Sequence, residues 1–214
     1  MIRQILADIS DVPDSALQYG VPDADRRYST DDYFRWDAVF EGFLEYDNGQ
    51  IKPASIGSPR QAATTASLHA ALWAAARGSG WRGFARSLRV FACEANAFLH
   101  PSLTMIEGKV ESGSHASGDT DGSVTNPHLI CEVMHPRDQR HNYCTRFNIY
   151  ATLPSFRAFV LVDPSKAFIE VSSRNPNGEW STSSQSGDDA TSHVPHLGID
   201  LRHAEVFEGT ASLT

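Results

Sequence analysis

Residues 126–164 constrain the fold of this chain more than any other segment. Their sequence is NPHLICEVMHPRDQRHNYCTRFNIYATLPSFRAFVLVDP. The apolar runs at 129–134 and 158–163 predict two strands that are covered on both faces. Only Glu132 interrupts the first run. A carboxylate inside an apolar strand is costly unless a metal ion or a cationic side chain compensates its charge, so Glu132 belongs to a functional site or to a structural ion pair.

A helix is predicted between these two strands. Asp138 is expected to cap it, and Tyr143, Phe147 and Tyr150 recur at helical spacing. Together with the flanking strands, this helix indicates a layered arrangement of sheet and helix.

The N-terminal part predicts an arm, a helix and a hairpin. Residues 1–27 are rich in Asp and Pro without periodicity, which predicts a loosely ordered arm. Thr30 is expected to cap the first helix. The dipeptide Asn48-Gly49, within an alternating segment, predicts a β-hairpin.

A long helix is expected to begin after Ser58, with Pro59 in its first turn, and to end at Gly78. Its buried face is predicted to contain Ala62, Ala66, Leu68, Leu72 and Trp73. Residues 78–83 match the letters of a dinucleotide-binding GxGxxG loop, but that function needs a strand before the loop and a helix after it. Here the order is reversed, so we interpret this segment as a helix stop followed by a turn.

The remaining patterns complete a mixed sheet flanked by helices, of the α/β or α+β class. Strands are expected at 84–90, 98–106, 158–163, 167–171 and 197–201, with a short helix at 203–207. The Gly-, Ser- and Asp-rich segment 108–125 is expected to be a mobile surface loop. Residues 28–214 are expected to form a single domain.

Composition limits the function classes. The formal net charge of −8 over 214 residues argues against a broad electrostatic surface for nucleic acid, although a local cationic groove remains compatible with it. No apolar run is long enough to span a membrane. Cys93, Cys131 and Cys144 show no CxxC pairing, which indicates reduced thiols and a cytoplasmic location. A zinc site made from His135, His141 and Cys144 lacks any standard spacing.

Several short motifs occur in a specific order and resemble the Uma-two family of restriction endonucleases, within the PD-(D/E)xK nuclease superfamily. The resemblance covers the chain from the helix near Thr30 to the segment near Phe207. The motifs are EYDNGQI at 45–51, GSPR at 57–60, PSLTM at 101–105, NPHLICEVM at 126–134, LPS at 153–155 and FVLVDP at 159–164.

The resemblance implies a restriction-endonuclease-like fold with one divalent cation, Mg or Mn, held by carboxylates on adjacent strands. It implies that Glu132 is a metal ligand and that Glu45 is the family's early acidic residue. In the family, the Asp of a P-D motif is the second ligand, and a Lys of the following helix orients the attacking water. Magnesium prefers oxygen ligands and would activate a bound water beside the phosphodiester.

This chain departs from the family pattern at catalytic positions. Ser102 replaces the metal-binding Asp, and Arg146 replaces the Lys. Gln61 and Asn142 also replace a family His and Asp. Because a serine hydroxyl adds no charge, the ion would depend on one certain carboxylate, and we predict instead an ion pair between Arg146 and Glu132.

We therefore expect a nuclease-fold protein with an eroded site, centred on Glu132, Arg146, Glu45 and Ser102, and with impaired cleavage. One alternative is an active Mg- or Mn-dependent DNA endonuclease. A further alternative is a module that binds nucleic acid or a protein partner without cutting. A homodimer is compatible with each of these functions, whereas a membrane partner is not expected.

Overall fold

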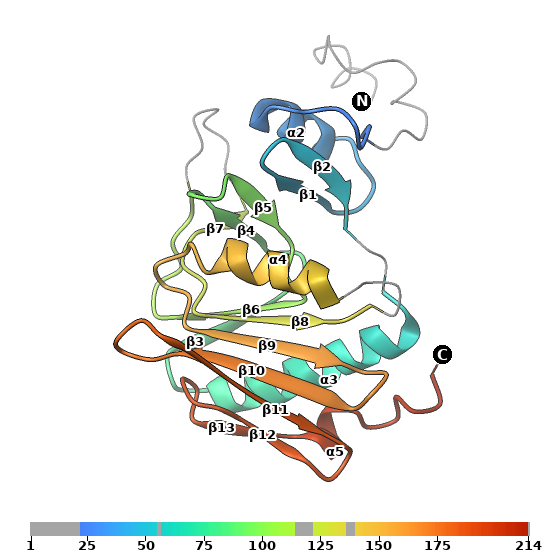
Figure 1. The fold of residues 1–214 in the computed structure, drawn as a ribbon, viewed down its shortest axis with the longest axis vertical. Coiled ribbons are helices and arrows are strands. Elements are labelled where there is room, and N and C mark those ends of the chain that lie inside the picture. The colour runs from blue at the N-terminus through green and yellow to red at the C-terminus, as the bar shows by residue number, and fades with distance from the viewer. Residues whose placement is uncertain (1–21, 55–56, 114–121, 136–139, 214) are drawn as a thin grey trace.

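The computed structural model describes residues 22–54, 57–113, 122–135 and 140–213. The fold contains two main sheets, a five-stranded sheet at the top of Figure 1 and a six-stranded sheet below it. Most of the expected arm, together with Asp138, lies outside these residues. Within the described part of the chain, no helix combines the length and apolar character needed to span a membrane.

The five-stranded sheet has the order β2-β1-β5-β4-β7. Its strands are β1 (Leu44–Asp47), β2 (Gln50–Pro53), β4 (Arg89–Ala92), β5 (Ala97–Leu99) and β7 (Ser123–Val124). The predicted hairpin is confirmed, because β1 and β2 pair in antiparallel register around Asn48 and Gly49. Both turn residues have positive φ, 42° and 97°, as a two-residue hairpin turn requires.

The first helix, α2 (Thr30–Asp37), packs on this sheet, but Thr30 does not cap it. Ser29 is the cap residue, and its hydroxyl accepts a hydrogen bond from the backbone N–H of Asp32. The Asp32 carboxylate in turn accepts one from the backbone N–H of Ser29. This reciprocal pair is a capping box, which satisfies two donors that the helix start leaves free.

The six-stranded sheet has the order β11-β10-β9-β8-β6-β3. Its strands are β3 (Trp81–Ala85), β6 (Leu103–Glu107), β8 (Leu129–Val133), β9 (Ala158–Asp163), β10 (Phe168–Arg174) and β11 (Trp180–Ser186). β8 and β9 are parallel, and the other neighbours are antiparallel. A mixed sheet flanked by helices is therefore confirmed.

The prediction of single strands at 84–90 and 98–106 was wrong. The chain turns between β3 and β4, and it crosses from one sheet to the other between β5 and β6. Pro101, which lacks a backbone N–H, lies at that crossing. β11 was missed because its serines and threonine carry no apolar alternation.

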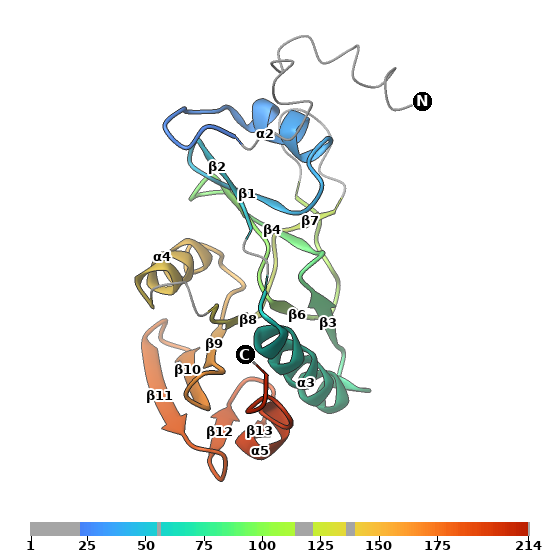
Figure 2. The ribbon, with the colours of Figure 1, turned by 90° about the vertical axis from the view of Figure 1, so that its right-hand side faces the viewer.

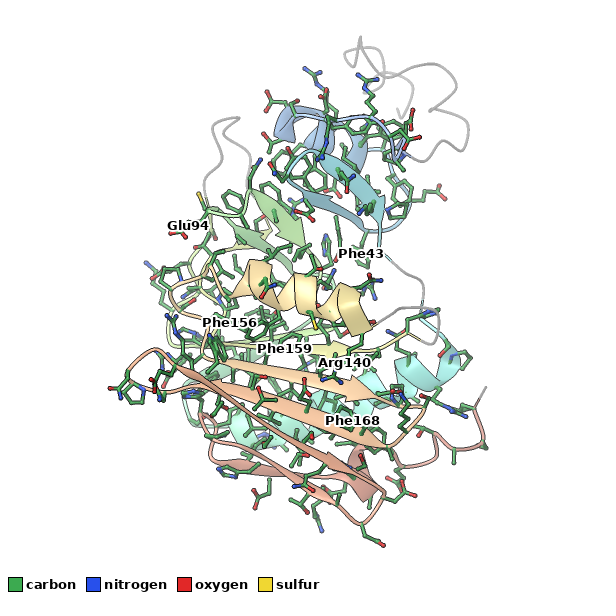
Figure 3. All side chains as sticks on the ribbon, viewed as in Figure 1. Phe43, Glu94, Arg140, Phe156, Phe159 and Phe168 are labelled. Atoms are coloured by element: carbon green, nitrogen blue, oxygen red, sulfur yellow. The ribbon has the colours of Figure 1, made fainter. Side chains whose placement is uncertain are left out.

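Helices and a small sheet cover the two faces of the six-stranded sheet (Figure 2). One face packs against α3 (Pro59–Ala76), the strand pair β12 (Thr191–Val194) and β13 (Ile199–Arg202), and α5 (His203–Val206). The other face packs against α4 (Arg140–Tyr150). Phe156 and Phe159 lie between this face and α4 (Figure 3), where their rings contact Phe147 at centroid distances of 6.0 and 5.5 Å.

The predicted start and stop of α3 are confirmed, with Ser58 as its cap and a left-handed Gly78 just beyond its end. Its predicted buried face was partly wrong. Ala62 and Ala66 are exposed, and Trp73 is 46% exposed. The buried face instead contains Gln61, Thr64, Leu68, Leu72 and Ala76.

The C-terminal strand and short helix are confirmed as β13 and α5. In the expected surface loop at 108–125, residues 114–121 lie outside the described residues, and β7 occupies its C-terminal end.

Candidate active site

The four predicted site residues come from four separate segments that meet beneath α4. Glu45 lies on β1, Ser102 at the crossing before β6, Glu132 on β8 and Arg146 on α4. Residues Leu129, Cys131 and Val133 of β8 pack on the α3 side. Because side chains alternate along a strand, Glu132 points to the opposite face, toward α4.

Arg146 lies between the two acids and binds both. Its Nε donates to Glu132 Oε1 at 2.7 Å, and its Nη1 donates to Glu45 Oε2 at 2.6 Å. Its Nη2 donates to the Tyr150 hydroxyl at 3.0 Å. The ion pair predicted between Arg146 and Glu132 is therefore confirmed, and it extends to a second carboxylate.

Glu132 has two further partners. The Tyr150 hydroxyl donates to Glu132 Oε1 at 2.7 Å, and the Ser102 hydroxyl lies 3.3 Å from Oε2. The Ser102 hydroxyl also accepts from the backbone N–H of Val133 at 3.1 Å, which fixes its position beside the acid. Serine thus fills the predicted ligand position as a hydrogen-bonding group without charge.

Glu45 is held from the side of the inter-sheet crossing. The backbone N–H of His100 donates to Glu45 Oε1 at 2.8 Å, while His100 Nδ1 lies 3.0 Å from the carbonyl oxygen of Arg86. Both oxygens of Glu45 therefore have partners, one on each side of the site.

The electrostatics of the network follow from burial and charge. Burial raises the pKa of Glu45, but the adjacent Arg146 guanidinium outweighs this and holds the pKa below its usual range. Burial lowers the pKa of Arg146, yet Glu132 and Glu45 raise it well above its ordinary value. Burial also raises the pKa of the Tyr150 hydroxyl well above its usual value. At neutral pH the site thus holds ionised Glu45, charged Arg146 and a neutral tyrosine that donates to Glu132.

A cleft of about 390 Å³ opens beside this network. Its walls contain all four predicted site residues and additional polar side chains from β1, β2 and α4. Lys52 and Arg86 contribute positive charge to the walls, and Asp47 contributes negative charge. Together with Glu45, Glu132 and Arg146, these residues make the cleft polar and close to charge balance.

The sequence does not predict a functional role for two residues of the site, Tyr150 and His100. The sequence pattern predicts Tyr150 only as part of the apolar face of its helix, although this residue lies four residues after Arg146, a spacing that places two side chains on one helix face. His100 gave no signal, because its role depends on a backbone N–H that meets a residue from another strand. Gln61, a predicted departure, lines the cleft and donates to the carbonyl oxygen of Val133 at 2.5 Å.

The donor set around Glu132 does not fit a magnesium ion. Magnesium requires near-octahedral oxygen ligands. Here the Arg146 guanidinium occupies the space between the two carboxylates and takes one oxygen of each. Among the residues that the structure describes, no group of three or more His, Cys, Asp or Glu side chains is arranged to hold a metal ion.

Comparisons with known proteins identify the family and support the fold. Residues 30–204 match the family model Uma2, described as putative restriction endonuclease. A solved structure from Anabaena variabilis ATCC 29413, described as a putative nuclease belonging to DUF820, superposes with a TM-score of 0.67 at 14% identity. The superposition covers 86% of this chain and 99% of that one. A search among curated proteins finds none that matches.

Proposed function

The chain belongs to the Uma2 family of putative restriction endonucleases, and from this premise we propose that Arg146 closes its catalytic site and impairs DNA cleavage. The family and the fold are those of a restriction-endonuclease-like nuclease. The eroded site is the part that we propose. Glu132, Arg146, Glu45 and Ser102 are its central residues.

The proposal depends on one observation, the position of the Arg146 guanidinium between Glu45 and Glu132. Restriction-endonuclease-like families generally use a divalent metal ion. A guanidinium that binds both acids competes directly with such an ion for their oxygens. Ser102 supplies no additional charge that would shift this competition toward the ion.

The replacement of lysine by arginine supports the same conclusion. Arginine carries a planar guanidinium that binds several acceptors at once, whereas lysine carries a compact ammonium on a flexible stem. The pKa of Arg146, lowered by burial but raised further by Glu132 and Glu45, lies well above its ordinary value. Arg146 therefore cannot accept a proton from an attacking water.

A plasmid-nicking assay with manganese tests the proposal. We expect the wild-type protein to nick supercoiled DNA no faster than Glu132→Gln does, because both lack a competent metal site. Clear nicking by the wild type that disappears in Glu132→Gln would instead show the alternative function, an active Mg- or Mn-dependent endonuclease.

The double variant Ser102→Asp with Arg146→Lys tests the cause. It places a second metal-binding carboxylate beside Glu132 and removes the guanidinium, so we expect metal-dependent nicking that the wild type lacks. Arg146→Lys alone is the matched control, because it removes the guanidinium without adding the ligand. If the double variant folds but stays inactive with both magnesium and manganese, the cause of the impaired cleavage lies at other residues.

A second function, binding without cutting, is favoured by the cleft that remains beside the ion pairs. Lys52 and Arg86 on its walls are suitable for a phosphate backbone. Gel shifts at increasing salt concentration provide the test, because phosphate-dominated binding weakens steeply with salt. If no nucleic acid binds at low salt, a protein partner remains as the ligand of this cleft.

We also propose that residues 28–214 act as one domain and that the protein works in the cytoplasm. Glu45 and Glu132 lie in different sheets and share Arg146, which supports a single unit. The three cysteines are all free, which is compatible with a reducing compartment.

A further inference from the structure

The strand β11 is an open edge of the six-stranded sheet. It is the terminal strand, and within the described residues it pairs with β10 alone. Its register with β10 is continuous from Arg174↔Trp180 to Phe168↔Ser186 and contains no bulge. The free side of this seven-residue strand therefore presents an unbroken row of backbone N–H and C=O groups, about 24 Å long.

β11 lacks the features that usually protect such an edge. Native edge strands are guarded by charged side chains, proline, bulges or a covering element. The sequence of β11, WSTSSQS, contains neither a charge nor a proline. The side chains from Ser181 to Ser186 are all exposed, so no described element covers them.

The other edge strands of the described sheets are protected. β3, at the opposite edge of the same sheet, packs against α3, whose Trp73 lies beside Gly83. β7 has only two residues. Guarding residues occupy the remaining edges: Arg82 in β3, Lys52 and Pro53 in β2, His193 in β12, and Asp200 and Arg202 in β13. Among the strands that the structure describes, the unguarded edge of β11 is thus an exception.

We propose that β11 pairs antiparallel with β11 of a second copy of this chain, around a two-fold axis near Ser183. Under this symmetry, each free N–H of one strand meets a free C=O of the other, and the two six-stranded sheets become continuous. Trp180 of one copy lies opposite Ser186 of the other, and every opposed pair is uncharged. Because each chain has one such edge among its described strands, the pairing closes as a dimer.

A second copy explains β11 better than a foreign strand does. Peptides that add to a sheet edge gain affinity from the main chain and specificity from pockets for their side chains. The small hydroxyl side chains of β11 select little in a foreign sequence. The same strand from a second copy matches them in length, charge and hydrogen-bonding groups.

The flanking charges predict how the dimer responds to salt. Glu179 precedes β11, and Asp188 and Asp189 follow it, all exposed. Antiparallel pairing brings Glu179 of one copy toward Asp188 of the other. Salt screens this repulsion, so the dimer strengthens as salt rises from about 0.05 to about 0.5 M.

Sedimentation velocity of the full chain tests the proposal. As the protein concentration rises from about 5 to about 500 μM, the wild type is expected to shift from its 23.5 kDa monomer toward twice that mass. This concentration dependence is expected because a small edge contact gives a weak dimer. Ser183→Lys places two lysines against each other at the axis and weakens the dimer about tenfold or more. Thr191→Lys, an exposed strand residue in β12, is the control and leaves association unchanged.

A mixing experiment distinguishes self-pairing from any other contact. Ser183→Asp alone also weakens association, but an equal mixture of Ser183→Lys and Ser183→Asp restores it, because opposite charges then meet. Thermal unfolding checks that each variant keeps the fold. A wild type that stays monomeric throughout, a dimer that Ser183→Lys leaves intact, or a mixture that fails to associate each overturns the proposal. All of these outcomes are independent of DNA cleavage.

Discussion

At the scale of single residues, Arg146 determines which partner the two acids of the site bind. Its planar guanidinium reaches Glu45, Glu132 and the Tyr150 hydroxyl together, which a lysine ammonium cannot match in geometry. One positive charge faces two carboxylates, so the network keeps residual negative charge. The hydroxyl of Ser102 completes the polar contacts of Glu132 without altering that balance.

The titration of two residues at this site predicts acid sensitivity. Burial lowers the pKa of His100, so its folded form favours the neutral ring. The stability that this provides is complete above about pH 6.5, the unfolded pKa, and is lost as pH falls toward the lower folded pKa. Glu45, whose folded pKa Arg146 depresses despite burial, loses its contribution only below about pH 4.3.

Urea unfolding between about pH 2.5 and about pH 8 checks this expectation, because the free energy of unfolding should fall in two stages as the pH is lowered. His100→Gln should reduce the first stage. His128, whose pKa burial and Arg157 also lower, should account for part of what remains. An unchanged slope between about pH 5 and about pH 7 in His100→Gln would contradict the assignment.

At the scale of elements, local chemistry determines where helices begin more reliably than it determines which face they bury. The cap of α3 was predicted correctly at Ser58, whereas α2 begins one residue earlier than expected, after Ser29. The face of α3 was partly mispredicted because alanine suits both exposed and buried helix positions. Trp73 is exposed at the margin of the sheet, where its ring lies against Gly83.

Two variants test the capping box of α2. Ser29→Ala removes the acceptor for the Asp32 N–H and should lower the free energy of unfolding by about 1 kcal/mol. Thr30→Ala should change it by less than about 0.5 kcal/mol, because Thr30 is the first helical residue and not the cap. Chemical denaturation measures both. Equal losses in the two variants would argue against the capping box.

At the scale of the whole molecule, the site also connects the two main sheets. Glu45 belongs to the five-stranded sheet and Glu132 to the six-stranded sheet. Arg146 binds both acids from α4, whose ribbon lies between the two sheets in Figure 1. The site residues therefore hold the fold together in addition to any role in binding. A buried ion pair of this kind is costly to break from one side, because the partner is left charged and unpaired.

Arg146→Ala should accordingly lower the free energy of unfolding by about 3–5 kcal/mol. The control is Arg157→Ala, which breaks a pair with Glu107 whose side chains are both 45% exposed, and it should cost about 0–1 kcal/mol. Urea denaturation at neutral pH compares the two variants. Similar losses in both would show that the network does not join the sheets as described.

The sequence by itself determined the features that depend on neighbouring residues. These include the hairpin at Asn48, the helix start at Ser58 and the buried strand around Glu132. They also include the need of that acid for a cationic partner, because a buried charge must be compensated wherever it lies.

Only the tertiary structure decided which groups meet in space. Glu45 and Arg146 are 101 residues apart, and their contact depends on the order in which distant strands pair. The same is true of the His100 backbone N–H at Glu45 and of the open edge at β11. Local patterns specify which segments become strands, whereas neighbours and edges follow from how all of the segments pack together.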